Sequence, residues 1–519
     1  MTTTPQDNLY AVLAANFPAE RTRCAIEALG GPQPLYYTWD DIERATAKLA
    51  NLLRGLGLPE GARIAAQTEK SVEALMLYLA VVRAGYVYLP LNTAYQHSEI
   101  SYFIGNAAPS VVVCNSRNFA WVSKIAFTAG VDHVFTLDDD RSGSLLQRAA
   151  HCADQFDTVA RRTDDLAAIL YTSGTTGRSK GAMLTHGNLA SNALVLKAAW
   201  GWRSGDVLLH ALPIFHVHGL FVASHGALAN GSKMIWLPRF DPAEVLRQLP
   251  RSTVFMGVPT LYVRLLAEPG FTREACSPMR LFVSGSAPLL IETFNEFSAR
   301  TGHTILERYG MSETVMLTSN PYSGERRGGT VGRPLPGVQV RVVGEGGRAL
   351  AAGEIGDIQV RGPNVFKGYW QMPEKTAEEF TADGYFKTGD VGRFSDDGYL
   401  TIVGRSKDLI ISGGYNVYPA EIESVLNELP GVAESAVVGV PHPDFGEAVV
   451  AVVVPRAGAQ LDAAQLIAAL KSRIANYKVP KLVEVAAELP RNAMGKVQKN
   501  LLRERHNALF TPSAARRAT

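Results

Sequence analysis

Short apolar runs alternate with segments of helix length through the first three hundred residues of the chain. The pattern predicts an amphipathic helix over 40–56, a buried strand over 63–67 and a second helix over 74–83. Further strand-like runs follow at 86–91, 111–114, 166–171, 207–212, 233–237, 253–258 and 280–284. Strands separated by helix-length segments indicate parallel βαβ units. Because such sheets bind ligands beyond the carboxyl ends of their strands, the loops after these strands are the expected place for chemistry.

The pattern changes near residue 337, where short apolar runs are separated by Gly-rich turns. Runs over 338–343, 356–361 and 399–403 are typical of a small antiparallel sheet or barrel. Between the first two, Gly344–Ala349 weakly imitates a dinucleotide-binding fingerprint. It opens no helix, so the pattern favours a hairpin turn.

Beyond Arg405 the pattern predicts a compact α+β unit, with helices and strands over 419–429, 436–440, 448–454 and 461–474. We therefore expect an α/β fold with a large N-terminal domain of doubly wound βαβ sheets over 1–406. This domain includes a small β-barrel-like subdomain over about 335–406. A small α+β C-terminal domain follows over 407–510, and 511–519 is expected to be a flexible tail.

Composition excludes several classes of protein. The 51 Lys and Arg against 49 Asp and Glu leave a net charge of +2, which argues against nucleic acid as the main partner. The longest apolar run, Ala74–Val82, is less than half a membrane span, so no membrane association is expected. The four cysteines lie far apart, and the N-terminal segment has the features of neither a secretory signal nor a transit peptide. A reducing compartment, the cytoplasm, is the expected location.

The strongest chemical signal is the Gly-rich segment Tyr171–Ala182, YTSGTTGRSKGA, directly after a predicted buried strand. Its glycines let the backbone approach an anion, its hydroxyls add donors, and Lys180 adds a cation. The spacing differs from a Walker A loop, which needs Gly-Lys followed by Ser or Thr. The segment predicts a phosphate-binding loop.

Five further motifs follow in order. They are Ser284–Pro288 (SGSAP), Tyr309–Glu313 (YGMSE), Tyr385–Asp390 (YFKTGD), Gly404–Asp408 (GRSKD) and Pro490–Lys496 (PRNAMGK). Together with the Gly-rich segment they resemble the adenylate-forming, AMP-binding superfamily of acyl-CoA synthetases, peptide-synthetase adenylation domains and luciferases. The resemblance extends over essentially the whole chain.

The resemblance implies a role for each motif. Tyr309 would stack on adenine, Ser312 would contact phosphate and Glu313 would supply the carboxylate for Mg²⁺, a hard cation that prefers oxygen ligands. Asp390 would bind the ribose hydroxyls and Arg405 the ribose or phosphate. The implied catalytic residues are Thr176, Glu313 and Lys496. The implied ATP contacts are Thr172, Ser173, Gly174, Thr175, Thr176, Gly177, Lys180, Ser286, Ala287, Glu307, Arg308, Tyr309, Gly310, Ser312, Asp390, Arg405 and Lys496.

The same resemblance implies a two-step reaction. A carboxylate attacks the α-phosphorus of Mg·ATP, with Lys496 and the Gly-rich loop neutralising charge, and an acyl-adenylate and pyrophosphate form. The C-terminal domain would then rotate about Lys407, withdraw Lys496 and present Ser412, Gly413 and Gly414 to a thiol channel. Coenzyme A attacks the adenylate, and AMP leaves.

The acid is indicated by two arginines, Arg264 and Arg308, which stand beside the site motifs. An unpaired guanidinium is costly in an apolar acyl pocket, whereas it binds a second carboxylate in a forked, charge-assisted geometry. The residues alone leave another interpretation open, in which Arg308 pairs with Glu307 or another acid and Arg264 extends from a helix surface.

Longer strings such as HALPIFHVHGLF and ERYGMSET resemble malonyl-CoA synthetases. In that family the equivalents of Arg264, Ser286 and Arg308 hold the distal carboxylate of malonate. His218 and Met311 are further expected pocket residues, and Met311 would tune the acceptance of methylmalonate. His216 and His218 lack the additional ligands that a metal site needs.

The sequence therefore predicts an ATP-dependent malonate–CoA ligase that uses Mg²⁺. A ligase for another short- or medium-chain acid and a catalytically silent nucleotide-binding relative are the alternatives. A peptide-synthetase module fits less well, because only about twenty residues follow Lys496. Acetylation of Lys496 by a lysine acetyltransferase, reversed by a deacetylase, would remove the charge that adenylation requires.

Overall fold

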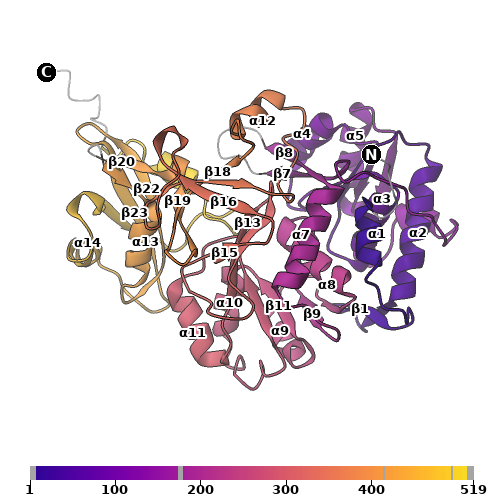
Figure 1. Cartoon of the computed structure of the whole chain (residues 1–519), viewed down its shortest axis with the longest axis horizontal. Coiled ribbons are helices and arrows are strands. Elements are labelled where there is room, and N and C mark those ends of the chain that lie inside the picture. Colours follow the sequence, from indigo (N-terminus) through magenta and orange to yellow (C-terminus); the bar gives the residue numbers. More distant parts are fainter. Residues whose placement is uncertain (1–6, 173–178, 413–414, 493–494, 511–519) are drawn as a thin grey trace.

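The computed structural model describes residues 7–172, 179–412, 415–492 and 495–510. Four sheets organise these residues, two large ones in the N-terminal part, one small antiparallel sheet after them and one in the C-terminal domain. The C-terminal domain lies at the opposite end of the molecule from helices α1 and α2 (Figure 1). The mixed α/β architecture with a large and a small domain confirms the predicted fold class.

The first large sheet has six strands in the order β6-β5-β3-β4-β7-β8. All neighbours are parallel except β7 and β8, which form an antiparallel pair on either side of the Gly-rich segment. Its strands are β3 (Arg63–Gln67), β4 (Val87–Pro90), β5 (Val111–Cys114), β6 (His133–Thr136), β7 (Leu166–Thr172) and β8 (Lys180–Thr185). Its helices are α2 (Trp39–Gly55), α3 (Val72–Arg83), α4 (His97–Ala107), α5 (Phe119–Thr128) and α6 (Ser144–Ala149).

The second large sheet has nine strands in the order β15-β14-β13-β12-β11-β9-β10-β1-β2. Its strands are β1 (Cys24–Ala28), β2 (Leu35–Thr38), β9 (Val207–His210), β10 (Lys233–Trp236), β11 (Val254–Gly257), β12 (Leu281–Ser284), β13 (Leu306–Met311), β14 (Val315–Ser319) and β15 (Arg333–Pro334). Its helices are α7 (His186–Ala199), the π-helix η3 (His218–Ser224), α8 (His225–Asn230), α9 (Pro242–Gln248), α10 (Pro259–Leu266) and α11 (Ile291–Thr301). The central strands β9 to β13 are parallel, as the alternation predicts.

Helix α3 lies in the core that the two large sheets share. Every residue of this helix is buried, because it is apolar on all sides and contacts helices α1 (Leu9–Ala14) and α2. Ser71 caps its N-terminus by accepting a hydrogen bond from the Ala74 amide (3.0 Å). The run that is too short to span a membrane is therefore a buried helix.

The four strands of the third sheet are antiparallel, in the order β16-β17-β18-β19. They are β16 (Gln339–Val343), β17 (Gly356–Arg361), β18 (Phe386–Phe394) and β19 (Leu400–Arg405), with helix α12 (Pro373–Glu379) before β18. Of the two forms expected from the sequence, a small antiparallel sheet or a barrel, the chain forms the sheet. The weak dinucleotide fingerprint forms a turn between β16 and β17, as predicted.

The fourth sheet belongs to the C-terminal domain. Its strands have the order β21-β20-β23-β22, and β24 pairs with β23. Its elements are β20 (Ile410–Ser412), β21 (Tyr415–Val417), α13 (Pro419–Asn427), β22 (Val432–His442), β23 (Gly446–Pro455), α14 (Ala463–Lys471), β24 (Leu482–Val485) and α15 (Lys499–His506). The chain passes from the third sheet to this one through the short turn Ser406–Asp408, where Lys407 is the expected hinge. Alternating buried positions on β22 and β23 pack against α13 and α14 on one face and α15 on the other.

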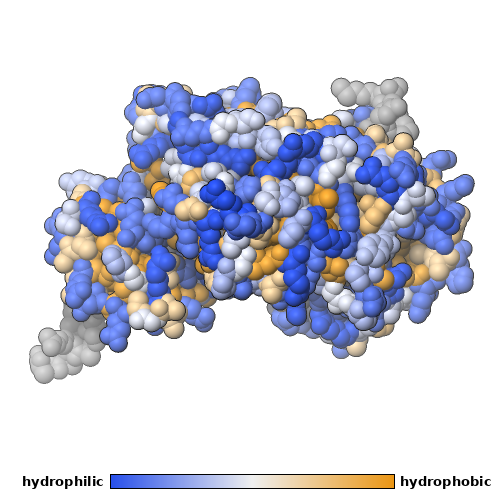
Figure 2. Space-filling model, turned by 90° about the horizontal axis from the view of Figure 1, so that it is seen from below, coloured by the Kyte–Doolittle hydropathy of each residue, from blue (hydrophilic) through white to orange (hydrophobic). Residues whose placement is uncertain are grey.

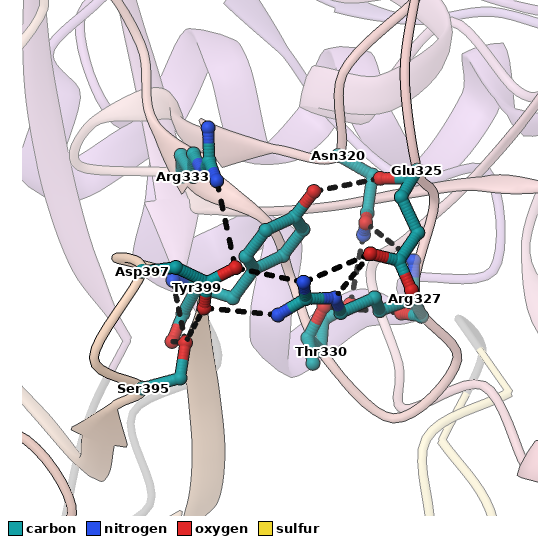
Figure 3. Close-up of polar contacts among 8 residues, drawn as sticks. All are labelled: Asn320, Glu325, Arg327, Thr330, Arg333, Ser395, Asp397 and Tyr399. Atoms are coloured by element: carbon teal, nitrogen blue, oxygen red, sulfur yellow. Dashed lines mark hydrogen bonds and ion pairs between the residues drawn. The ribbon is translucent and has the colours of Figure 1, made fainter.

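A polar cluster fastens the β18–β19 hairpin to the loop after β14 (Figure 3). Arg327 pairs with Glu325 (2.8 Å) and Asp397 (2.7 Å) while its guanidinium lies 4.1 Å from the centroid of the Tyr399 ring. Arg333 lies against the same ring at 4.6 Å. Strand β19, which ends at the hinge, is therefore anchored on the large domain.

Hydrophilic side chains cover most of the face in Figure 2, with apolar groups scattered between them. A smaller lobe joins a larger one in this view. Among the described residues, no helix combines the length and apolar character that a membrane span requires.

An ion pair in the interior ties the start of β9 to the start of β12. Arg280 Nε donates to Asp206 Oδ1 (2.6 Å), and both side chains are at least nine-tenths buried. The Thr253 hydroxyl and the Arg203 amide also donate to Asp206 (2.9 Å each). Removing one partner leaves the other charge buried without compensation.

We therefore predict that Asp206→Ala lowers the free energy of unfolding by about 3–5 kcal/mol. Urea denaturation followed by tryptophan fluorescence measures this change. Asp396→Ala, on the exposed turn before β19, is the matched control and should leave the midpoint unchanged. Equal midpoints for both variants would contradict the prediction.

Candidate active site

A cavity of about 1190 Å³ lies where the carboxyl ends of strands from both large sheets meet the third sheet and the C-terminal domain. Its wall contains the ends of β4, β7 and β13 and the segments that follow β9 and β12. This is the place that the parallel topology predicts for ligands. Residues from the hinge turn and from the loop before α15 complete the wall.

Most of the predicted site residues in the described part of the chain line this cavity. They are Thr172, Lys180, His218, Ser286, Arg308, Gly310, Met311, Ser312, Glu313, Arg405, Lys407 and Lys496. Six others lie outside its wall, and they are Arg264, Ala287, Glu307, Tyr309, Asp390 and Ser412. Seven expected residues fall outside the described ranges, and they are Ser173, Gly174, Thr175, Thr176, Gly177, Gly413 and Gly414.

Tyr309 and Asp390 lie together directly behind the wall. The buried Tyr309 hydroxyl donates a hydrogen bond to Asp390, and burial beside this carboxylate raises the pKa of Tyr309. Arg405 pairs with the other oxygen of Asp390 (2.7 Å). The motif of β13 is thus joined to the motifs of β18 and β19, while stacking of Tyr309 on adenine remains a prediction.

Glu313 is a buried carboxyl at the cavity wall. Its Oε1 accepts a hydrogen bond from the Tyr369 hydroxyl (3.0 Å), and burial raises the pKa of Glu313. The ammonium of Lys180 lies 4.2 Å from the centroid of the Tyr369 ring and 3.5 Å from Glu379. The Gly-rich strand pair therefore brings a cation beside an oxygen ligand, as binding a metal-bound polyphosphate requires.

Sequence reasoning missed Tyr369 and Glu379 as site residues. Tyr369 belongs to the string GPNVFKGYW, and Glu379 belongs to helix α12. Neither residue stands in a motif whose spacing indicates a catalytic or binding role. The contact with Glu313 needs the pairing of β8 with the segment before α12, in which Ala182 bridges to Tyr369. That pairing is long-range, so a local pattern does not reveal it.

Lys496 enters the cavity from the C-terminal domain. Its backbone amide donates to Asn492 Oδ1 (3.0 Å), which shapes the loop that carries it. Burial, followed by the nearby Arg405 guanidinium, lowers the pKa of Lys496, whereas Asp390 and Glu313 act in the opposite direction. The side chain of Lys496 therefore lies near Arg405, Asp390 and Glu313.

All but one of the expected acid-pocket residues line the cavity, and they are His218, Ser286, Arg308 and Met311. The Ser286 hydroxyl lies 3.4 Å from His218 Nδ1. Arg308 is only 2% exposed, and its Nε and Nη2 have no hydrogen-bond partner among the described residues. Burial lowers the pKa of Arg308 to about 9.

Arg308 and Glu307 do not form the ion pair that one interpretation of the sequence allows. Consecutive side chains on β13 point to opposite faces. Glu307 Oε1 accepts a hydrogen bond from the Leu289 amide (3.1 Å), and burial raises the pKa of Glu307 to about 8. The guanidinium instead faces the backbone of Gly285, where a Cβ would lie 2.5 Å from the Arg308 Cζ.

The structure does not bring Arg264 to Arg308. Helix α10 turns Tyr262 inward, where its hydroxyl donates to the Val283 carbonyl (2.7 Å), and leaves Arg264 exposed on the opposite face. Residues two apart on a helix do not share a face, which explains the separation. Of the two arginines, the structure thus places Arg308 alone in the wall of the cavity.

Comparison with known proteins identifies the family. The AMP-binding enzyme model matches residues 15–370, and the AMP-binding enzyme C-terminal domain model matches 421–496. The chain therefore belongs to the AMP-binding enzyme family, and the site and the relatives together define an AMP-forming acid–CoA ligase. The crystal structure of ATP-bound MatB from Rhodopseudomonas palustris is 54% identical, with a TM-score of 0.94 over 97% of this chain and 99% of that one.

Two curated relatives act on different acids. A malonate–CoA ligase of Arabidopsis thaliana is 37% identical over 482 residues, which cover 87% of this chain and 79% of the relative. A feruloyl-CoA synthase of an Amycolatopsis species is also 37% identical, over 477 residues that cover 90% and 94%. Overall identity to these two relatives does not distinguish a diacid from an aromatic acid, so the residues of the pocket must.

Over the whole chain the structure is more similar to the ATP-bound form of MatB than to its apo form. Apo MatB of the same bacterium has the same 54% identity and the same coverage but a TM-score of 0.84, against 0.94 for the ATP-bound form. This agrees with the position of Lys496 inside the cavity.

We predict that Gly285→Ala selectively weakens binding of the acid, because the added Cβ would displace the Arg308 guanidinium. The KM for the acid should rise about tenfold, and the KM for ATP should stay within about twofold, since a displaced binding group acts locally. Pyrophosphate release at varied acid and ATP concentrations measures both constants. Gly105→Ala on α4, where an added Cβ meets no atom within 4 Å, is the matched control. A rise of both KM values would mean a general disturbance.

Proposed function

We propose that this protein is an ATP-dependent malonate–CoA ligase that forms malonyl-CoA, AMP and pyrophosphate through a malonyl-adenylate, with methylmalonate as a second substrate. The observation that carries the proposal is the buried guanidinium of Arg308 in the cavity wall, which lacks a carboxylate partner among the described residues. We infer that the acid supplies that partner. A dicarboxylate can do so, because it has a second carboxylate besides the one that reacts.

The pocket also argues against the second candidate, a ligase for an uncharged acyl group. An apolar or aromatic acyl chain would leave the guanidinium desolvated and unpaired, at a cost of several kcal/mol (order of magnitude). His218 and Ser286 beside it are polar as well. The similarity to a feruloyl-CoA synthase is therefore assigned to the shared fold and ATP site.

In the proposed adenylation step, a carboxylate oxygen of malonate attacks the α-phosphorus of ATP and pyrophosphate leaves. Lys180 and Lys496 face the cavity from opposite domains and would neutralise the charge that develops on the phosphates. Glu313 fits as the protein ligand of Mg²⁺, since this cation usually takes one or two carboxylates and otherwise phosphate and water. When bound, Mg²⁺ would neutralise the phosphates and align the leaving group.

In the proposed thiolation step, the sulfur of coenzyme A attacks the carbonyl carbon of the adenylate, and AMP leaves with the bonding electrons. Ser412 is buried on β20 and lies outside the cavity wall in this arrangement. We propose that rotation about Lys407 withdraws Lys496 and brings the 412–414 segment to the cavity. A lysine needed in one step and absent in the other requires a separate mobile domain.

The first test measures AMP release with ATP, Mg²⁺ and coenzyme A for malonate, methylmalonate, succinate, acetate and octanoate. We expect a strong preference for malonate. A preference for acetate or octanoate would overturn the substrate proposal and leave the ligase reaction standing. Release with none of the acids would favour the catalytically silent alternative.

We predict that Arg308→Ala lowers kcat/KM for malonate by about two to three orders of magnitude, since truncating one partner of a buried charge pair costs about 2–5 kcal/mol. Turnover of acetate should not fall. Arg264→Ala is the matched control and should change kcat/KM by less than about twofold, because this side chain is exposed on α10. Full activity of Arg308→Ala with malonate would contradict the prediction. An equal loss of kcat/KM in Arg264→Ala would mean that both arginines bind the acid.

We predict that Lys496→Gln lowers the rate of malonate-dependent pyrophosphate exchange by about 10²–10³, as loss of one preorganised charge does. Thioester formation from supplied malonyl-AMP should persist. Acetylation, the proposed modification by an acetyltransferase, removes the same charge and should have the same effect. Normal exchange by acetylated protein would contradict this regulation.

A further inference from the structure

A buried lysine outside the cavity wall has no acidic partner. Lys70 follows β3, is 9% exposed, and forms no ion pair with any acid in the described part of the chain. Its ammonium donates to the His210 carbonyl (2.9 Å), lies 3.0 Å from His210 Nδ1 and lies 4.5 Å from the centroid of the Trp236 ring. Buried lysines are almost always paired, so this arrangement needs an explanation.

His210 transmits the contact to the π-helix η3. This residue ends β9 and is fully buried, and its Nε2 lies 3.0 Å from the Gly219 carbonyl and 3.1 Å from the Ser224 hydroxyl. Because the Gly219 carbonyl can only accept, Nε2 carries the proton, and the Nδ1 of the neutral ring accepts from the Lys70 amino group. The protonated Nε2 therefore donates to the Gly219 carbonyl, which also accepts from the Ser224 hydroxyl (2.9 Å).

Gly219 belongs to the first turn of this π-helix and fits closely against the preceding loop. A Cβ at this position would lie 1.9 Å from the Pro213 carbonyl oxygen, so the turn has no room to shift toward β9. π-Helical turns are rare and occur frequently at functional sites. Two donors on one carbonyl and this close approach fix the turn from both sides.

The residue before Gly219 is His218, which lines the acid pocket. Its Nδ1 lies 3.4 Å from the Ser286 hydroxyl, and its Nε2 has no hydrogen-bond partner among the residues that the structure describes. The contacts therefore run from the loop after β3, through His210 and the Gly219 carbonyl, to a histidine that faces the substrate. Lys70 and His210 themselves lie outside the cavity wall.

We infer that Lys70 and His210 are positioning residues for the acid, which hold the first turn of η3 and thereby set His218 beside Ser286 and Arg308. The inference rests on the proposed function only in the choice of malonate as the acid. Lys70 and His210 form no hydrogen bond with Glu313 or Arg405, which are expected on the ATP side, so we expect their loss to raise the KM for the acid more than the KM for ATP.

The test compares His210→Leu, which removes the donor to Gly219, with His210→Gln, which keeps an amide N–H at similar reach. We expect His210→Leu to raise the KM for malonate about tenfold, as misplacing a binding group does. The kcat and the KM for ATP should stay within about twofold. His210→Gln should remain within about threefold of the unchanged protein, and Lys70→Met should follow His210→Leu.

A double-mutant cycle separates positioning from general stability. In the His218→Ala background, His210→Leu should have little further effect on the KM for malonate, because the side chain that it positions is already gone. Additive effects would overturn the inference, as would an equal rise in the KM for ATP or an unchanged KM in His210→Leu. If His210→Leu does not fold, Ser224→Ala removes the second donor on the same carbonyl and takes its place in the cycle.

Failure of the malonate proposal is distinguishable from failure of this inference. A preference of the unchanged protein for another acid contradicts the malonate proposal alone. The cycle is then measured with the preferred acid, and its non-additivity still decides whether His210 acts through His218.

Discussion

A guanidinium held away from water and from every described carboxylate determines the character of the cavity. Arg308 is placed there by β13, and its room is provided by the absence of a side chain at Gly285. Placing a charge in such surroundings is unfavourable unless something of opposite charge arrives. If the acid supplies this partner, as we propose, the pocket selects a substrate that carries a second carboxylate. The same strand carries Tyr309 on its other face, so the acid pocket and the nucleotide side share one support.

The ATP side depends on contacts between elements that are far apart in the chain. Asp390 on β18 forms an ion pair with Arg405 of β19 and accepts a hydrogen bond from Tyr309 of β13. The Arg327 cluster attaches the same hairpin to the loop after β14. The strand that leads into the hinge is therefore rigid up to Arg405. The proposed rotation of the C-terminal domain would then change the surroundings of Lys496 while Asp390 and Arg405 stay in place.

Sequence reasoning predicted the parallel sheets and the third sheet, because buried strands, Gly-rich turns and helix-length spacings leave local signals. It also placed most of the described motif residues at one cavity. Arg264 shows the limit of such reasoning. Tyr262 and Arg264 point to opposite faces of α10, and the sequence around them gives no sign of which face is buried. Tyr369, Lys70 and His210 escaped notice because their roles arise from long-range contacts.

These contacts suggest how one fold serves different acids. The residues expected to contact phosphates stand near strand ends and are positioned by the sheets, whereas the residues proposed to contact the acid are Arg308 on one strand and His218 in the π-helix that follows β9. The turn depends on buried polar donors that contact neither substrate. Changing such donors would alter the acid pocket without disturbing the ATP site, because the two sites share β13 but not the loop after β9. If Lys70 and His210 position His218 as we infer, specificity is carried partly by residues outside the cavity wall.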